Sequence, residues 1–267
     1  MSGTKDRRKV TRTQIAGFGY HDVTDVPTES GFQRNGALPY KLDLDHFRKH
    51  LDRIGAGLAA PALVTDIDLI RQGRHLLLTF DDGGKSALQI SDELCRRGWR
   101  GHFFITTGLI GQRTFLDANE IRHLHSCGHV VGSHSHTHPD IYRELGREQM
   151  VVEWRQSCDV LAQLLGEPCV TGAVPGGEIS APVLRSASAA GLRYLFTSEP
   201  CLTPRIVGGC WVLGRFCAKT TTSAEEISEL AQFRGWTSKL LVRRLKNAAR
   251  KSVPPLYRLY VSRSTRE

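Results

Sequence analysis

The feature that most constrains this chain is an apolar run that ends in two carboxylates and two glycines. Residues 76–84 read Leu-Leu-Leu-Thr-Phe-Asp-Asp-Gly-Gly. A short apolar run bounded by turn residues is typical of a strand buried on both faces of a parallel sheet. The carboxyl ends of such strands are where α/β folds place their ligands, so Asp81 and Asp82 are candidate site residues. Taken alone, the pair is better explained as a loop that caps the next helix.

A histidine cluster about fifty residues later changes that balance. Residues 132–139 read Gly-Ser-His-Ser-His-Thr-His-Pro. In an extended strand all three imidazoles would share a face, whereas in a helical turn His134 and His138 would meet and His136 would point elsewhere. Two imidazoles and one carboxylate with open positions suit a catalytic metal. The alternative is a polar loop without a metal, and the nearby acidic strand end favours the metal.

The two motifs together resemble a known family. Residues 79–82 (Thr-Phe-Asp-Asp) and 134–139 (His-Ser-His-Thr-His-Pro) are similar to the first two motifs of the polysaccharide deacetylases, the NodB-homology family also called carbohydrate esterase family 4. Residues 98–105 and 20–22 resemble further segments of that family. The resemblance covers roughly residues 15–223. It implies an α/β fold, a distorted (β/α) barrel with about seven parallel strands.

The later motifs depart from the family pattern. Where the family has Arg-x-Pro-aromatic-Gly, residues 173–177 read Ala-Val-Pro-Gly-Gly, so Ala173 holds the place of the arginine that orients the catalytic carboxylate. Arg215, near the end of an expected strand, is our candidate for that role. The late Leu-x-His motif is absent, since no histidine follows His138. His21 is our candidate for the missing general acid, although a surface-loop role explains it equally well.

The predicted function is the metal-dependent hydrolysis of acetyl groups, most simply N-acetyl groups, on a polysaccharide, an oligosaccharide or a lipid-linked glycan precursor. We predict that Asp82, His134 and His138 bind one divalent ion, most simply zinc. Asp81 would act as general base, and the resemblance implies that the backbone N–H of Gly176 donates to the oxyanion. One alternative is a sugar-binding protein of the same fold that keeps the metal without turnover, in polysaccharide biosynthesis. Another is a metal hydrolase or isomerase of a different barrel superfamily.

Length and charge suggest the organisation of the chain. The 267 residues suit one large α/β domain, and we expect a basic segment at 1–13, a catalytic domain at 14–235 and a basic helical tail at 236–267. The net charge of +9 is concentrated at the ends, with +4 in residues 1–12 and +8 in residues 236–267. This distribution argues against a nucleic-acid partner. The tail is either a docking segment for an anionic membrane or a solvated basic helix.

The remaining sequence signals concern location. No stretch is apolar enough to span a membrane, and the first residues lack the apolar core of a secretory signal. Seven cysteines are scattered singly, which favours reduced, buried thiols over a disulfide framework. We therefore expect a cytoplasmic protein with peripheral membrane contact through its tail. The sequence gives no indication of oligomeric state.

Hydrophobic periodicity and turn residues predict alternating strands and helices. The expected strands are 14–20, 61–65, 76–80, 102–106, 130–131, 169–174, 193–197 and 211–216. The expected helices are 43–54, 86–97, 117–127, 147–165, 181–190, 224–233 and 238–251.

Overall fold

The computed structural model describes residues 13–57, 59–177, 179–252 and 261–265. The predicted segment 1–13 therefore lies almost entirely outside the described residues. The strands are β1 (Gln14–Tyr20), β2 (Arg74–Phe80), β3 (His102–Ile105), β4 (Val130–Ser133), β5 (Thr171–Ala173), β6 (Tyr194–Thr197), β7 (Arg205–Val207), β8 (Cys210–Gly214) and β9 (Phe216–Cys217). The helices are α1 (Leu44–Gly55), α2 (Ala87–Cys95), α3 (Ala118–Ser126), α4 (Arg147–Leu165), α5 (Ala181–Ala189), α6 (Ala224–Ala231) and α7 (Trp236–Ser252).

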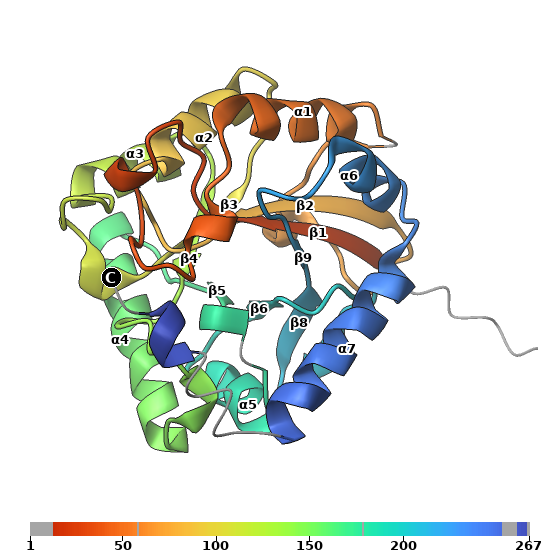
Figure 1. The fold of residues 1–267 in the computed structure, drawn as a ribbon. Coiled ribbons are helices and arrows are strands. Elements are labelled where there is room, and N and C mark those ends of the chain that lie inside the picture. Colours follow the sequence, from red (N-terminus) through yellow and green to blue (C-terminus); the bar gives the residue numbers. More distant parts are fainter. Residues whose placement is uncertain (1–12, 58, 178, 253–260, 266–267) are drawn as a thin grey trace, which may run out of the picture.

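The strands form one curled sheet with helices on its outside (Figure 1). Its order is β7-β8-β6-β5-β4-β3-β2-β1-β9, and every pairing is parallel except that of β7 with β8. Right-handed crossovers through a helix are the usual way to join parallel strands, and the alternation of strands and helices follows from it. The predicted distorted (β/α) barrel is confirmed, although the number of strands differs slightly from seven.

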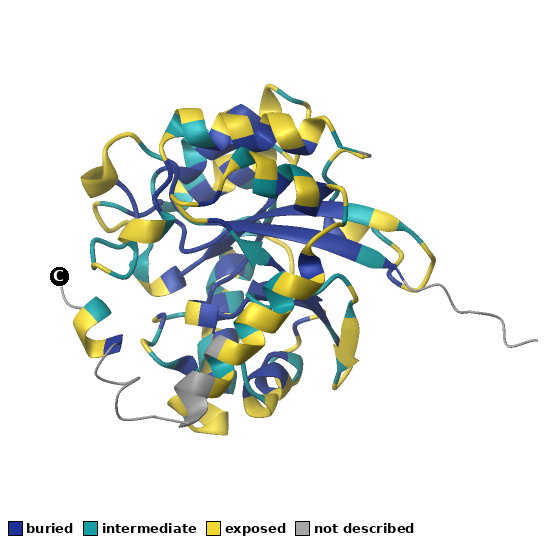
Figure 2. Cartoon of the chain, turned by 45° about the vertical axis from the view of Figure 1, so that its right-hand side comes forward, coloured by how far each residue is buried: buried dark blue, intermediate teal, exposed yellow. Residues whose placement is uncertain are grey.

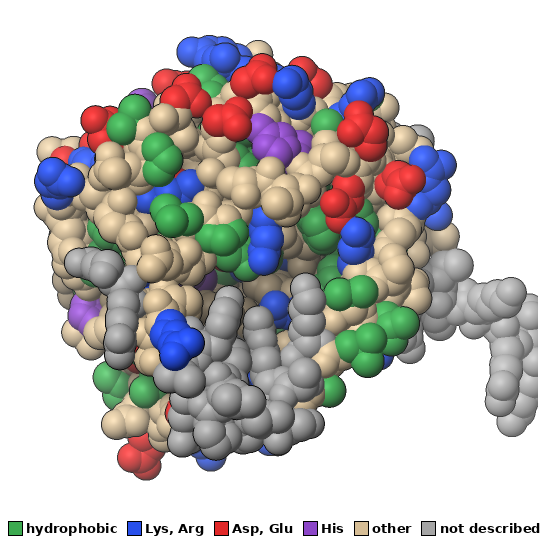
Figure 3. Space-filling view, in the orientation of Figure 1, with side chains coloured by type: hydrophobic (Ala, Val, Ile, Leu, Met, Phe, Trp, Pro, Cys, Tyr) green, Lys and Arg blue, Asp and Glu red, His purple; other side chains and the backbone are tan. Residues whose placement is uncertain are grey.

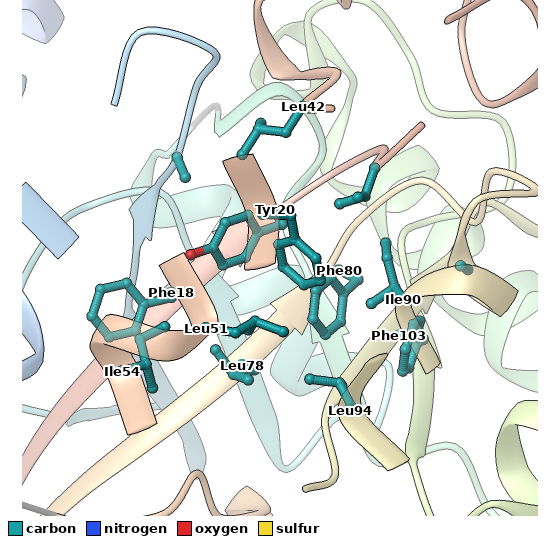
Figure 4. Packing of buried hydrophobic residues seen from close by; sticks show 14 of the residues in the cluster. Phe18, Tyr20, Leu42, Leu51, Ile54, Leu78, Phe80, Ile90, Leu94 and Phe103 are labelled. Carbon is teal, nitrogen blue, oxygen red and sulfur yellow. The ribbon is translucent and has the colours of Figure 1, made fainter. Parts of the chain in front are cut away.

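Side chains of β2 alternate between two cores. Leu76, Leu78 and Phe80 pack outward against helices in a cluster that includes Tyr20 and Leu51 (Figure 4). Leu77 points inward, into a second cluster that contains residues from β1, β3, β5, β6 and β8. This alternation has a period of two, so the next inward positions after Leu77 are Thr79 and Asp81. Most strands are largely buried on both faces, whereas the edge strand β7 is largely exposed, and the helices expose their outer sides (Figure 2).

Two predicted strands are wrong in ways that bear on the site. Residues 61–65 are not a strand. Ala62 N donates to Leu76 O of β2 at 2.8 Å, but Val64 N then bonds to the His102 side chain and the chain turns into the 3-10 helix η3 (Val64–Asp66) instead of continuing along β2. The single expected strand 211–216 is split. β8 pairs with β6, the chain bends at Arg215, and β9 then pairs with β1 on the other side of the sheet. Arg215 therefore lies at a break between strands and not at the end of one.

Most other elements agree with the prediction to within a few residues. The predicted capping box of α3 is present, since the Asp117 side chain accepts from Glu120 N and the Glu120 carboxylate accepts from Asp117 N. All seven cysteines are free thiols, but only Cys210 is fully buried, so the expectation of buried cysteines was too general. Within the described residues, no helix combines the length and apolarity that crossing a bilayer requires.

Candidate active site

Asp81 continues the inward row of β2 into the interior of the barrel. Its N–H donates to Tyr20 O at 2.9 Å, which holds it beside the end of β1. The next residue, Asp82, has a φ of 76°, so the chain turns and the second carboxylate does not follow the strand alternation. Both carboxylates are buried. The strand has ended before either aspartate, and the two side chains reach different partners.

Asp81 is held by Arg215 in a bidentate ion pair. Arg215 Nη1 lies 2.7 Å from Asp81 Oδ1, and Nη2 lies 2.9 Å from Oδ2. Nη1 also donates to Thr79 Oγ1 at 2.7 Å, and Nε donates to Thr197 O at 3.4 Å. Burial alone would raise the pKa of the Asp81 carboxyl, but the charges of Arg215 and His134 hold that pKa below its ordinary value. The sequence-based choice of Arg215 as partner of Asp81 therefore agrees with its placement.

The strand β1 makes room for this arginine with two glycines. A Cβ on Gly17 would lie 2.6 Å from Gly214 O and 3.2 Å from Arg215 Cγ. A Cβ on Gly19 would lie 3.1 Å from Cys217 Sγ. The alternation Gly-x-Gly on the inward face of a strand is a sequence signal for close approach of another chain segment, and our sequence analysis did not use it.

Asp82, His134 and His138 form the one cluster in the described part of the chain whose ligand atoms could hold a metal ion, all lying within 4.8 Å of one another. Asp82 Oδ1 is 3.2 Å from His134 Nε2 and 3.7 Å from His138 Nε2. The histidines leave β4 in a loop that is neither strand nor helix, with positive φ at Ser135 and His138. Ser135 Oγ accepts from His138 N at 3.1 Å and stabilises that turn.

The rings of the two histidines are oriented from behind by different groups. His134 Nδ1 is 2.9 Å from Ala173 O, so it donates there and leaves Nε2 free as a ligand. His138 Nδ1 is 3.1 Å from Arg34 Nη2, which can only donate. An ion on His138 Nε2 would put the ring proton on Nδ1, so Arg34 would then keep only its ion pair with Asp140. Burial lowers the pKa of His138 to about 3, consistent with a neutral imidazole.

His136 is outside this cluster, so the three imidazoles do not share one face as they would in an extended strand. Its Nδ1 contacts Thr107 Oγ1 at 3.0 Å, and its Nε2 lies 3.1 Å from Gln156 Nε2. Its backbone N–H donates to the Glu153 carboxylate at 2.9 Å. His136 therefore fixes the loop that carries the two other histidines.

The site opens into a cavity of about 600 Å³ at the carboxyl ends of the strands. Asp81, Asp82, His134, His138 and Arg215 lie along it, as do His21 and Gly176. His21 directly follows β1 and packs its ring 4.6 Å from that of Tyr40, and its Nδ1 is buried without a hydrogen-bond partner among the described residues. Gly176 lies in the turn η6 (Pro175–Gly177) with a φ of 59°. All seven predicted site residues thus line one cavity.

Part of the chain matches a known protein family. Residues 70–195 match the family model described as polysaccharide deacetylase. The match covers 126 of the 267 residues and includes both the Asp81-Asp82 and the histidine motif. The resemblance seen in the motifs is confirmed, and with it the predicted class of enzyme, a deacetylase, at the level of the family. No curated protein matches the chain.

Solved structures share the fold at low sequence identity. A polysaccharide deacetylase from Bacillus cereus aligns with a TM-score of 0.69 and 17% identity, over 82% of this chain and 69% of that one. A deacetylase from Streptococcus pyogenes in complex with acetate aligns with a TM-score of 0.67 and 19% identity, over 81% and 97%. IcaB from Ammonifex degensii aligns with a TM-score of 0.66 and 19% identity, over 82% and 97%. These likenesses establish the fold of the chain.

Several residues of the cavity were not singled out from the sequence. Asp22 is buried and accepts from Ser30 Oγ at 2.5 Å and Ser86 Oγ at 2.9 Å. Burial is the main cause that raises the pKa of its carboxyl. Lys239, Val242 and Arg243 of α7 also line the cavity, so part of the predicted tail borders the site. Asp22 belongs to the 20–22 segment that resembles the family, whereas no local motif marks the residues of α7, which reach the cavity only through the folded arrangement of distant segments.

Proposed function

We propose that this protein removes acetyl groups from an acetylated carbohydrate, most simply N-acetyl groups, with the help of one divalent metal ion, most simply zinc. The observation that carries the proposal is the pairing of two devices in one cavity. A carboxylate locked by a bidentate arginine lies next to an Asp/His/His cluster. The cavity is open at the carboxyl ends of the strands, where a sugar can enter.

The donor set fits a metal of this kind. One carboxylate oxygen and two imidazole nitrogens are suitable ligands for zinc, and three protein ligands leave a position open for water or substrate. His134 already has the orientation that ligating histidines require, since its other nitrogen donates to a backbone carbonyl. An ion held by these residues would polarise the acetyl carbonyl and lower the pKa of a bound water.

The residues of the chain would carry the proton transfers. Asp81 would accept a proton from the attacking water, and its pair with Arg215 fixes the carboxylate and keeps it ionised at neutral pH. The water oxygen adds to the carbonyl carbon, and the N–H of Gly176 would donate to the resulting oxyanion. The C–N bond then breaks, and His21 would give a proton to the departing amine. The unpartnered Nδ1 of His21 supports this role.

The test combines metal analysis with acetate release from an N-acetylated chitooligosaccharide. The wild type is expected to contain metal and to release acetate. Asp81→Asn should keep the metal and lose about 10²–10⁴-fold in turnover, because only the proton acceptor is removed. Asp82→Ala should lose both. An Asp82→Ala protein that is fully loaded with metal and active would refute the proposed ligands.

A second candidate function is favoured by the missing late histidine and by Ala173. A sugar-binding protein that keeps the metal without turnover would show full metal content and bind the oligosaccharide, yet release no acetate.

An O-acetylated xylooligosaccharide, assayed in parallel, separates N-acetyl from O-acetyl preference.

A further inference from the structure

Helix α7 is packed along the rim of the cavity. Trp236, at its start, is buried, and its Nε1 donates to Leu230 O at 2.9 Å. Lys239 forms an ion pair with Glu226. Arg243 Nη2 donates to Gly177 O at 2.8 Å, in the turn that also contains Gly176. One side of α7 is therefore fixed against the catalytic domain and borders the site.

The outer side of α7 is apolar where a solvated helix would be polar. Leu241, Val242 and Leu245 are 58%, 49% and 63% exposed, and they are three of the eight large hydrophobic residues that are exposed in the described chain. Val242 also lines the cavity, so this apolar surface begins at the opening itself. Hydrophobic side chains lie along α7 on the face that Figure 3 shows.

A further exposed apolar residue lies next to the cavity wall. Leu38 is 46% exposed and lies on the turn η2 (Leu38–Tyr40). Its neighbours Ala37 and Tyr40 line the cavity. An exposed apolar side chain therefore adjoins the cavity wall outside α7 as well.

The charge of α7 indicates which partner covers this surface. The sequence of the helix contains six lysines and arginines and no acidic residue, and residues 236–267 carry a net charge of +8. A helix with exposed leucines between basic residues matches the pattern of helices that lie in the plane of a bilayer interface. A second copy of the chain would bring two strongly basic segments together, and their repulsion disfavours it.

We propose that α7 is a docking helix for an anionic lipid bilayer. Leu241, Val242 and Leu245 enter the interface beside the exposed Arg244, and the net positive charge of the segment attracts the anionic headgroups. Because α7 borders the cavity, docking turns the opening toward the membrane. The substrate is then an acetylated glycan that is attached to a lipid at the membrane surface; this part of the proposal rests on the proposed function.

Vesicle co-sedimentation of the full chain tests the docking. The protein is expected to sediment with vesicles of phosphatidylcholine that contain one-third phosphatidylglycerol, and to stay in solution with pure phosphatidylcholine. Salt should release a large part of the bound protein, because it screens the headgroup charges. Equal binding to both vesicles, or no binding to either, would overturn the proposal. So would a dimer in solution that Leu241→Glu/Leu245→Glu converts to a monomer.

The matched control variant uses exposed apolar residues elsewhere. Leu241→Glu/Leu245→Glu should lower the partition onto anionic vesicles at least about tenfold. Ile70→Glu/Ile206→Glu makes the same change of charge at residues that are 82% and 58% exposed, and Ile70 precedes β2 at the end of the strand away from the cavity. This control should bind like the wild type. If both double variants lose binding equally, net charge alone governs the interaction and α7 is not the docking element.

Activity on a soluble substrate separates this proposal from the proposed function. Leu241 and Leu245 do not line the cavity, so Leu241→Glu/Leu245→Glu should release acetate from a soluble chitooligosaccharide like the wild type. On a lipid-linked N-acetylglucosamine in anionic vesicles, the same variant should be slowed about tenfold in line with its lost partition. A wild type that binds vesicles and releases acetate from neither substrate would refute the function and leave docking intact. Equal rates of wild type and variant on the lipid-linked substrate would refute membrane presentation.

Discussion

The segment that matches the family model, residues 70–195, and the segment that follows it contribute different parts of one site. The first supplies the carboxylates and the histidines in the family's own motifs. The second supplies Arg215 at the break between β8 and β9, and the rim helix α7. The positive charge that pairs with Asp81 can therefore come from a different strand when the interior of the barrel has room for the arginine. Ala173 and the glycines of β1 provide that room.

The largest effect is expected from Arg215→Ala. This change leaves the buried Asp81 without its partner, so we expect a loss of about 3–5 kcal/mol in the free energy of unfolding. Turnover should fall about 10²-fold or more, since the base loses its fixed orientation. Urea unfolding and acetate release measure the two effects. Arg215→Lys is the control, because it keeps a charge but not the two-pronged contact and should fall between the variant and the wild type. A stable and active Arg215→Ala protein would show that Asp81 does not need the charge that the second segment supplies.

A rescue experiment asks whether an arginine at position 173 can replace the arginine at position 215. Arg215 Cζ lies 5.7 Å from the centroid of Phe104 and 5.9 Å from that of Phe196, and Ala173 belongs to the same interior cluster as both rings. Adding Ala173→Arg to the Arg215→Ala variant should therefore recover about tenfold in turnover, if the new guanidinium reaches Asp81. In the wild type, Ala173→Arg should instead destabilise by about 1–3 kcal/mol, because the interior is already filled. Absence of any rescue would show that the arginine must come from the second segment.

The smallest effect concerns acid, and it involves buried histidines that all precede the second segment. Every histidine lies at or before residue 138. Burial lowers the pKa of His50, His102 and His129 from 6.5 to about 4. Between these two pH values the unfolded chain binds more protons than the folded one, so stability falls as the pH is lowered through this range.

His102 offers the cleanest measurement of that acid effect. It donates from Nδ1 to Leu78 O and accepts from Val64 N at Nε2, so its neutral form is fixed at both ends. We expect the contribution of His102 to the free energy of unfolding to fall by about 1–2 kcal/mol between neutral pH and about pH 5. Urea unfolding at the two pH values, for wild type and His102→Gln, measures it. An unchanged pH dependence in the variant would show that His102 does not contribute.

The sequence was sufficient where function depends on short patterns. The apolar run before Asp81 and the capping box at Asp117 follow from local geometry, and the structure has them as predicted. His134 and His138 also come together, but through an irregular loop that neither the strand nor the helical alternative described. The false strand at 61–65 shows the limit of such patterns, because Val64 N bonds to the distant His102 side chain and the chain turns into η3 instead of pairing along β2.

Other parts of the site depend on distant contacts that no local pattern encodes. Arg34 reaches His138 from a loop more than a hundred residues earlier in the chain. Arg243 contacts the turn at Gly177 across 66 residues. The predicted domain boundaries stay a prediction, although the contacts of α7 show that the helix after residue 235 is part of the wall of the cavity.

The bend at Arg215 also sets a minimum length for any working fragment. The same few residues that bring the guanidinium to Asp81 also lead the chain from β8 across to β9, where it pairs with β1. A piece excised at the limits of the family match, residues 70–195, would hold Asp81, Asp82, His134 and His138, yet would lack both Arg215 and the pairing of β9 with β1. A proteolytic fragment that ends before residue 217 should thus release no acetate, even when it retains every motif residue.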